Sequence, residues 1–247
     1  EGTLFFTGVG DLLEQQISRA SPLEQALLTW LAIEREPVSL ERLMSDLSHP
    51  RRPTQAGSLN RTAVLAALHA LWRRNLIERG QTNLTFTLQR VVLEYLTERL
   101  VTRMADEIQH NSFDTLLHYA LMQATAKDYV RHSQERLIAT PLLQRLGGSY
   151  GRADGVDRQL LPLLDVWRAQ PLTEQGYGPG NVLHLLRLLR GNLRGLNLAR
   201  LALLEVYWQG MEAQDSSLAE ALVRNNVFTE AFGIVHAIAS TPSGSYW

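Results

Sequence analysis

The basic residues of this chain limit its phosphate chemistry, because Lys127 is the only lysine among 24 lysines and arginines. A P-loop needs a lysine directly after a glycine-rich turn, since backbone N–H groups cradle the phosphates while the lysine reaches their oxygens. Lys127 lies in the segment Ala124–Asp128, which has no glycine. We therefore expect no P-loop in this chain. Lys127 is also the single candidate for Schiff-base chemistry.

Metal and nucleophile chemistry find little support in the residue pattern. The absence of cysteine excludes disulfide scaffolds, thiolate zinc sites and cysteine nucleophiles. The histidines show no metal-ligand spacing, and no nucleophile elbow marks a serine. We expect no catalytic residue, no metal site and no enzyme activity, and we expect His110 and His118 to be ordinary surface or capping residues. The seven histidines are His49, His69, His110, His118, His132, His184 and His236.

Two glycine-containing stretches could suggest nucleotide binding. Gly8-Val9-Gly10 is too short for a dinucleotide fingerprint. The stretch Gly147–Gly151 could resemble a phosphate loop, but its composition favours a flexible linker. We expect no cofactor bound by either stretch.

The composition is that of a packed globular chain. Its 247 residues are 45% hydrophobic and 20% charged with a net charge of −1, and they suggest one large domain or two to three small ones. The near-neutral charge removes the simplest argument for a nucleic-acid or membrane surface. No apolar stretch is long enough to span a bilayer, and no secretory signal opens the chain, so we expect a cytoplasmic protein without membrane contact.

The N-terminal third predicts a helical unit that ends in a β-hairpin. Ser21-Pro22-Leu23-Glu24 combines a hydroxyl cap, a proline at the first helical position and a glutamate at the third. Three helices followed by two short strands are typical of a winged helix-turn-helix. The expected elements are helices over 22–33, 39–47 (capped by Ser39) and 61–75, a loop over 49–60, and strands over 76–78 and 85–88.

Residues 91–190 predict a helical arm. The apolar spacing indicates a long helix over 91–110, and Pro141 is expected to break a later one. Arg187 and Arg190 are expected to be solvated residues beside a core, with an inter-domain contact as the alternative. The other helices expected are 113–125, 128–146, 156–169 and 182–189, with a linker over 147–151 and a turn over 176–180.

The periodicity changes after Asn192, where apolar residues recur every fifth position. Such residues would spiral around a helix and alternate faces on a strand. A square coil with four five-residue sides instead points every fifth residue inward, which is the logic of a solenoid repeat. A leucine-rich helix over Leu196–Tyr207 is the alternative. The five-spaced residues are Leu193, Leu198, Leu203, Trp208, Ala213, Leu218, Val223 and Phe228.

Several segments resemble bacterial STAND-class signalling NTPases of the NB-ARC type that carry a WD-repeat propeller. Together they cover nearly the whole chain. The segments are Leu23–Glu41, similar to the family's winged helix; Phe86–Gln89 with Val91–Arg99, similar to its hairpin and following helix; Ala126–Arg131 with Gln134 and Arg136–Ile138, similar to its helical linker; Gly180–Leu186 leading into Asn192–Gly195, similar to its entry into pentapeptide repeats; and Val235–Ala239 with Thr241–Trp247, similar to the start of a WD repeat.

The resemblance implies a role in switching. In such proteins the winged helix packs against ADP in an off state, and exchange for ATP leads to oligomerisation. The family senses nucleotide with a histidine at the end of the winged helix, and Gln89 occupies that position here. Its amide can still donate a hydrogen bond to a phosphate. The resemblance thus implies ADP or ATP in the full-length protein, and Gln89 is the candidate cofactor-binding residue.

The absence of an initiating Met, and a final strand-like segment without a partner strand, predict a piece of a longer polypeptide. Its partners would be the nucleotide-binding domain and the propeller of the same polypeptide, with homo-oligomerisation on activation. The expected fold is mainly α: a winged-helix domain over 1–90, a helical arm over 91–190, a short right-handed pentapeptide β-helix over 191–231, and the start of a truncated propeller over 232–247. The expected function is a non-catalytic relay between propeller and switch.

A winged-helix DNA-binding transcription regulator is the main alternative. A recognition helix presents base-reading residues near its N-terminus and basic residues toward phosphates. The candidate helix offers Arg61 followed mostly by small and apolar residues, while Arg73, Arg74 and Arg79 lie at its far end and in the wing. This scatter favours a protein-packing winged helix, and we expect no DNA partner. A free-standing repeat scaffold for protein binding is a third possibility.

Overall fold

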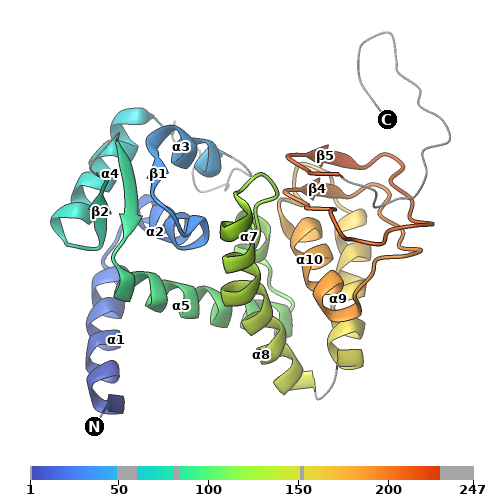
Figure 1. Cartoon of the computed structure of the whole chain (residues 1–247), viewed down its shortest axis with the longest axis horizontal. Helices are drawn as coiled ribbons and strands as arrows, with labels where there is room; N and C mark the ends of the chain where they lie inside the picture. Colours follow the sequence, from blue (N-terminus) through green and yellow to red (C-terminus); the bar gives the residue numbers. More distant parts are fainter. Residues whose placement is uncertain (1, 49–59, 81–83, 151–152, 229–247) are drawn as a thin grey trace.

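The computed structural model describes residues 2–48, 60–80, 84–150 and 153–228 (Figure 1). Over these residues the chain is mainly helical, with a small antiparallel sheet near one end and a small parallel sheet near the other. This confirms the mainly α part of the predicted fold class. The predicted start of a propeller over 232–247 lies outside the described residues, as does most of the predicted loop over 49–60.

The N-terminal lobe, residues 22–88, contains the three predicted helices and both predicted strands. A further strand, β1, pairs antiparallel with β3 and gives the strand order β1-β3-β2. The buried Val38 faces Phe86 in this sheet, and Ile77 faces Leu88. A strand of two residues is too short to show alternation, so the sequence pattern did not reveal it. The elements are α2 (Pro22–Glu34), β1 (Val38–Ser39), α3 (Leu40–Ser48), α4 (Arg61–Arg73), β2 (Ile77–Arg79) and β3 (Thr85–Leu88).

Side-chain caps begin the first two helices of the lobe. The Ser21 hydroxyl accepts from the Glu24 backbone N–H at 3.3 Å, and the Glu24 carboxylate accepts from the Ser21 N–H at 2.7 Å. This capping box satisfies donors that the first turn of α2 leaves free. The Ser39 hydroxyl accepts from the Arg42 N–H at 3.2 Å and caps α3. Both predicted helix starts are therefore confirmed.

Two long helices flank the lobe. α5 (Arg90–Gln109) confirms the helix predicted over 91–110, whereas α1 (Gly2–Ser18) was not predicted. Glycine disfavours a helix interior, and α1 contains Gly8 and Gly10. Figure 1 shows α1 projecting from the body of the molecule. Its Glu14 carboxylate accepts a hydrogen bond from the Tyr95 hydroxyl of α5.

The helix predicted over 113–125 is mostly wrong, because α6 (Asp114–His118) has only one turn. The amide of Asn181, far along the chain, binds the segment that follows. Its Oδ1 accepts from Leu121 N–H at 2.8 Å, and its Nδ2 donates to the carbonyls of Leu116 and Tyr119, both at 2.8 Å. These bonds replace intrahelical ones and hold the segment in an irregular path.

A continuous helical rod contradicts the predicted break at Pro141 and the predicted linker over 147–151, of which residue 151 lies outside the described residues. It consists of α7 (Asp128–Gln134), a π-helical turn η2 (Glu135–Ala139) and α8 (Thr140–Tyr150). A proline ring clashes with the carbonyl four residues back in an α-helix, and the wider π turn directly before Pro141 relieves that clash. Leu146 is fully buried, which holds the glycine-containing end of α8 in helical form.

α9 (Ala153–Arg168) and α10 (Gly178–Arg190) complete the arm. α10 begins inside the segment predicted as a turn over 176–180, so that turn is shorter than expected. A side chain at Gly180 would place its Cβ 2.4 Å from the carbonyl oxygen of Leu204. Glycine is therefore needed here because α10 packs closely against the C-terminal segment.

The C-terminal coil, residues 192–228, has a twenty-residue period. β4 (Ala202–Leu204) pairs in parallel with β5 (Leu222–Arg224), and Leu203 faces Val223. Further bridges join Asn197 to Ser217 and Tyr207 to Val227. Each partner lies twenty positions along, as four five-residue sides require. A strand within 196–207 also shows that the alternative of a leucine-rich helix was wrong.

The corners of the coil lie at every fifth residue, and each has a positive φ. Five-spaced residues of the first turn point inward and are fully buried, and Trp208 stacks on Phe228 with ring centroids 5.6 Å apart. Val223 and Phe228 in the second turn remain 41% and 46% exposed. The corners are Gly195, Arg200, Glu205, Gly210, Asp215, Glu220 and Asn225.

Candidate functional site

Gln89, the predicted nucleotide-sensing residue, lies between β3 and α5. It occupies the N-cap position of α5 with an extended backbone (φ −61°, ψ 146°) and is half-buried. Its side chain makes no capping hydrogen bond with the described part of the helix. The amide is therefore available at the edge of the N-terminal lobe, and nucleotide contact by Gln89 remains a prediction.

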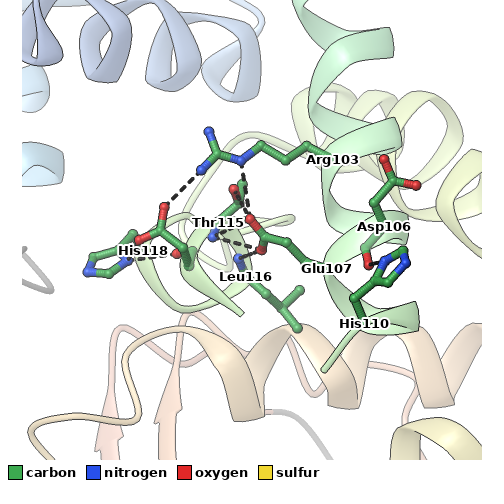
Figure 2. Close-up of polar contacts among 8 residues, drawn as sticks. Arg103, Asp106, Glu107, His110, Thr115, Leu116 and His118 are labelled. Carbon is green, nitrogen blue, oxygen red and sulfur yellow. Dashed lines mark hydrogen bonds and ion pairs between the residues drawn. The ribbon is translucent and has the colours of Figure 1, made fainter. Parts of the chain in front are cut away.

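Around the far end of α5, Glu107 anchors the next helix (Figure 2). Its buried carboxylate accepts from the Thr115 N–H at 2.8 Å and hydroxyl at 2.6 Å, and from the Leu116 N–H at 3.2 Å. Arg103 lies 3.2 Å from the same carboxylate and 3.0 Å from Asp114. Glu107 thereby satisfies the first N–H groups of α6 and complements its positive end.

The two histidines labelled in Figure 2, His110 and His118, cap helix ends. This confirms the prediction that they are surface or capping residues. The His110 Nδ1 bonds the Asp106 carbonyl at 2.8 Å, and the His118 Nδ1 bonds the Asp114 carbonyl at 2.7 Å. Because a carbonyl only accepts, each Nδ1 carries the hydrogen.

A buried amide network joins the N-terminal lobe to the rod. Gln134 donates to the carbonyl of Ile33 at 2.9 Å and to the side chain of Gln123 at 3.1 Å, and it accepts from the Gln123 N–H at 3.0 Å. Gln123 in turn donates to the buried carboxylate of Glu34 at 2.7 Å. The Ile33 carbonyl and the side chains of Gln134, Gln123 and Glu34 thus all have hydrogen-bond partners. Because they are buried, these hydrogen bonds are stronger than they would be in water.

Further buried polar side chains join the arm to the C-terminal coil. Gln175 accepts from the Ala202 N–H at 2.7 Å and donates to the Arg200 carbonyl at 3.1 Å. The His184 Nε2 donates to the Glu205 carbonyl at 3.0 Å. Burial, followed by the charge of Arg187, lowers the pKa of His184 to about 4, so the ring is neutral at physiological pH.

Carboxyl groups gather where α3 approaches the coil. Arg42 lies 2.9 Å from Glu34 and 3.3 Å from Asp46. Burial, and then the nearby charge of Glu34, raises the pKa of Asp46 to about 9. Burial also raises the pKa of Glu205, although Asn225, Arg42 and backbone N–H groups oppose the shift. Two carboxyl groups with raised pKa values thus lie at one junction.

Arg187 and Arg190 were expected to be solvated, and the structure corrects this. Arg187 forms an ion pair with Glu135 of the π turn, and both residues are largely shielded. Arg190 bonds both carboxylate oxygens of Asp157 on α9. Both guanidinium groups thus pair with carboxylates on other elements, and Arg190 stays exposed.

Lys127 forms a surface ion pair. Its ammonium lies 2.8 Å from Glu36, which raises the pKa of the lysine. Schiff-base chemistry needs a lysine whose pKa is lowered, so this environment disfavours it.

The exposed side of α4 is poor in free cations. Arg61 at its N-terminus lies 3.0 Å from Glu41. Trp72 is 42% exposed, and the Arg79 guanidinium covers its ring at 4.6 Å. A recognition helix needs hydrogen-bond donors for base edges near its N-terminus. Arg61, which lies there, already pairs with a carboxylate.

The residues that the structure describes contain neither a cluster of metal ligands nor a membrane-spanning helix. No group of three or more histidine or acidic side chains there is arranged to hold a metal ion. None of the helices there is both long and apolar enough to cross a bilayer.

The chain is similar to an uncharacterized WD repeat-containing protein from Nostoc sp. strain PCC 7120. The two are 31% identical over 277 aligned positions, which cover 99% of this chain and 21% of the relative. The chain thus spans about a fifth of the relative's length. No protein-family model matches the chain, and no solved structure does. The relationship therefore connects this chain to a WD-repeat-containing protein.

Sequence reasoning missed the buried polar residues at the junctions. Each contacts a partner far away in the sequence, and a single glutamine or asparagine in an apolar helix gives no local signal of that partner. Asn181 gave a weak signal of a buried polar contact. It is a polar residue between the glycine-rich segment 176–180 and a strongly apolar helix.

Proposed function

We propose that this chain is the non-catalytic coupling segment of a STAND-class signalling ATPase with a WD-repeat propeller. In this proposal, ligand binding at the C-terminal propeller is relayed to a nucleotide-dependent oligomerisation switch in the cytoplasm. The full-length protein binds ADP or ATP, and this segment performs no chemistry. The similarity to a WD repeat-containing protein supports a propeller in the same polypeptide.

The architecture supports the proposed identities of the two ends. A winged helix for residues 22–88 is supported by three helices and the antiparallel strand order β1-β3-β2. A pentapeptide β-helix for residues 192–228 is supported by left-handed corners every fifth residue and by the twenty-residue pairing register. These two modules would meet the ATPase core and the propeller, respectively.

Three sets of buried polar contacts between the lobe and the coil are the observation that carries the proposal. Glu34, Gln123 and Gln134 join the lobe to the rod. Asn181 joins the segment after α6 to α10, and Gln175 joins the arm to the coil. A satisfied buried polar network favours one arrangement over others, because any displacement leaves dry groups unpaired. Elements held in one arrangement move together as a rigid unit. A displacement at one end is then passed to the other end, as a two-state relay requires.

Gln89 is the proposed point of contact with nucleotide. Its half-buried amide at the β3–α5 junction is free of a capping bond within the described helix. It can donate to a phosphate oxygen of ADP bound by the preceding ATPase core. Gln89→Ala should then speed ADP release by the full-length protein without changing its fold.

The relay is tested by ADP release from the full-length protein and from a version that ends at Trp247. If the signal passes through this chain, the two release rates of a fluorescent ADP differ. Gln175→Ala breaks the arm–coil contact and should make the two rates converge. Gln109→Ala removes a single exposed bond to Ser149, observed at 2.8 Å, and should leave the difference intact.

Two outcomes would overturn the proposal. One is a full-length protein that binds neither ADP nor ATP. The other is ADP release at the same rate with and without the region after Trp247.

A further inference from the structure

The two ends of the C-terminal coil are covered differently. At the first turn, Gln175 accepts from a backbone N–H of β4 at 2.7 Å. His184 donates to the Glu205 carbonyl of the same turn at 3.0 Å. Figure 1 shows β5, in the second turn, on the side of β4 that faces away from α10, and among the described residues β5 pairs only with β4. We refer to this side of the second turn, with Leu218 and Val223, as the open end.

Backbone N–H groups at the open end have no acceptor among the described residues. In the first turn, the N–H groups of Leu198 and Glu205 donate to carbonyls of the second turn at 2.8 and 3.1 Å. The register of twenty residues makes Leu218 and Asn225 their equivalents in the second turn. The N–H groups of these two residues therefore point out of the open end. A row of unpaired backbone groups of this kind is a template for a further strand.

The apolar interior of the coil reaches the open end without a polar cap. Leu198 and Leu203 of the first turn are fully buried. Twenty residues later, Leu218 is half-buried and Val223 is 41% exposed. A repeat that ends an array in water carries a polar outer face. The open end thus combines apolar side chains with unpaired backbone, which are the features of an interface.

The polypeptide that follows the coil is held next to the open end. The described chain reaches Phe228 only five positions after Val223. The WD repeat-containing relative extends well beyond the matched region, because this chain covers 21% of it. A tethered domain has an effective concentration of roughly millimolar, which favours it over a separate molecule. The blades of a propeller are four-stranded sheets and therefore offer strand edges.

We infer that the open end of the coil is the docking face for the WD-repeat propeller, and that a strand edge of one blade pairs with the second turn and covers Leu218 and Val223. The inference rests on the proposed function, which supplies the propeller. In strand addition, main-chain hydrogen bonds give affinity, and pockets for alternate side chains give specificity. Docking of this kind fixes the propeller to the coil, so that a displacement of the propeller reaches the arm.

Cysteine labelling of the full-length protein tests whether the open end is covered. Val223→Cys places a thiol at the open end, and Ala219→Cys places one at an exposed position outside the row of inward residues. This chain has no cysteine of its own. In the native protein, a maleimide should modify position 223 at least about tenfold more slowly than position 219, because only the docked propeller shields it. Mass spectrometry of the labelled peptides measures both rates, and in urea the two should agree.

A photo-crosslink identifies what covers the open end. When p-benzoylphenylalanine replaces Val223 in the full-length protein, irradiation should link it to a peptide that follows Trp247 and give a product with the mass of one chain. The same residue in place of Ala219 should give no such link.

Three outcomes would overturn the inference. The first is equal labelling of positions 223 and 219 in the native protein. The second is irradiation that gives no link to a peptide after Trp247. The third is a product with the mass of two chains, which would place a second copy at the open end. Neither measurement uses nucleotide, so a failure here leaves the test by ADP release standing, and a protein that binds no nucleotide leaves the docking result standing.

Discussion

His184 lies between α10 and the C-terminal coil, where its Nε2 donates to the Glu205 carbonyl. The bond fixes one tautomer of the ring. Its Nδ1 is buried and has no partner among the described residues. Protonation would place an uncompensated charge at that atom, which explains why burial dominates the lowered pKa.

The pKa of His184 predicts a loss of stability in acid. The folded-state pKa of about 4 lies below the ordinary value of 6.5, so the unfolded chain binds more protons between these values. The free energy of unfolding should therefore fall as the pH falls below 6.5 and level off below 4. The contribution of His184 is about 2 kcal/mol at about pH 5, which urea unfolding can measure.

His184→Gln provides the comparison, because its amide can still donate to the carbonyl and does not titrate. The loss attributed to His184 should disappear in this variant, while the exposed His69→Gln should keep it. Equal pH dependence of His184→Gln and the unmodified chain would contradict the assignment.

Gln134, at the end of α7, makes buried hydrogen bonds that join α2 to the rod. Gln134→Leu would leave the Ile33 carbonyl, the Gln123 N–H and the Gln123 side-chain oxygen without their bonds. We expect a loss of at least about 2 kcal/mol in the free energy of unfolding, measured in urea. Gln109→Leu, which loses an exposed bond, should cost less than about 0.5 kcal/mol.

Replacing glycine by alanine should have opposite effects on stability in the coil and in the rod. Gly210 is a coil corner with φ +71°, whereas Gly147 is helical, and no atom lies within 4 Å of a Cβ built at either position. Gly210→Ala should therefore cost about 1 kcal/mol of backbone strain. Gly147→Ala should stabilise by about 0.5–1 kcal/mol, because alanine favours a helix. Thermal unfolding of both variants checks the signs, and a shift in the same direction would refute this explanation.

Among the elements, those with strong local signals could be predicted. The capping box before α2, the long apolar face of α5 and the five-residue spacing of the coil each arise from neighbours in the sequence. The short α6 could not be predicted, because the distant contacts of Asn181 hold the segment after it in an irregular path. Arg187 and Arg190 were misjudged for the same reason, since their carboxylate partners lie on other helices. At the candidate site, the sequence indicated only Gln89.

At the scale of the whole molecule, no excess of positive charge stands out. The net charge is −1, and many arginines pair with carboxylates. DNA affinity arises largely from the release of counterions by clustered cations. We therefore expect no gel shift with duplex DNA at physiological salt, and no difference on changing Arg73 and Arg74 to Gln. A shift that is lost steeply as salt rises would instead favour the transcription-regulator alternative.

The twenty-residue period of the coil limits how insertions can alter the distance between the helical arm and the end of the coil. An insertion of five residues preserves every inward position and moves the exit by one side of the square. An insertion of twenty residues keeps the exit direction and raises it by one strand spacing, about 4.8 Å. An insertion whose length is not a multiple of five turns apolar side chains to the outside. The coil can thus act as a spacer in which the length along its axis and the direction of the exiting chain change only in discrete steps.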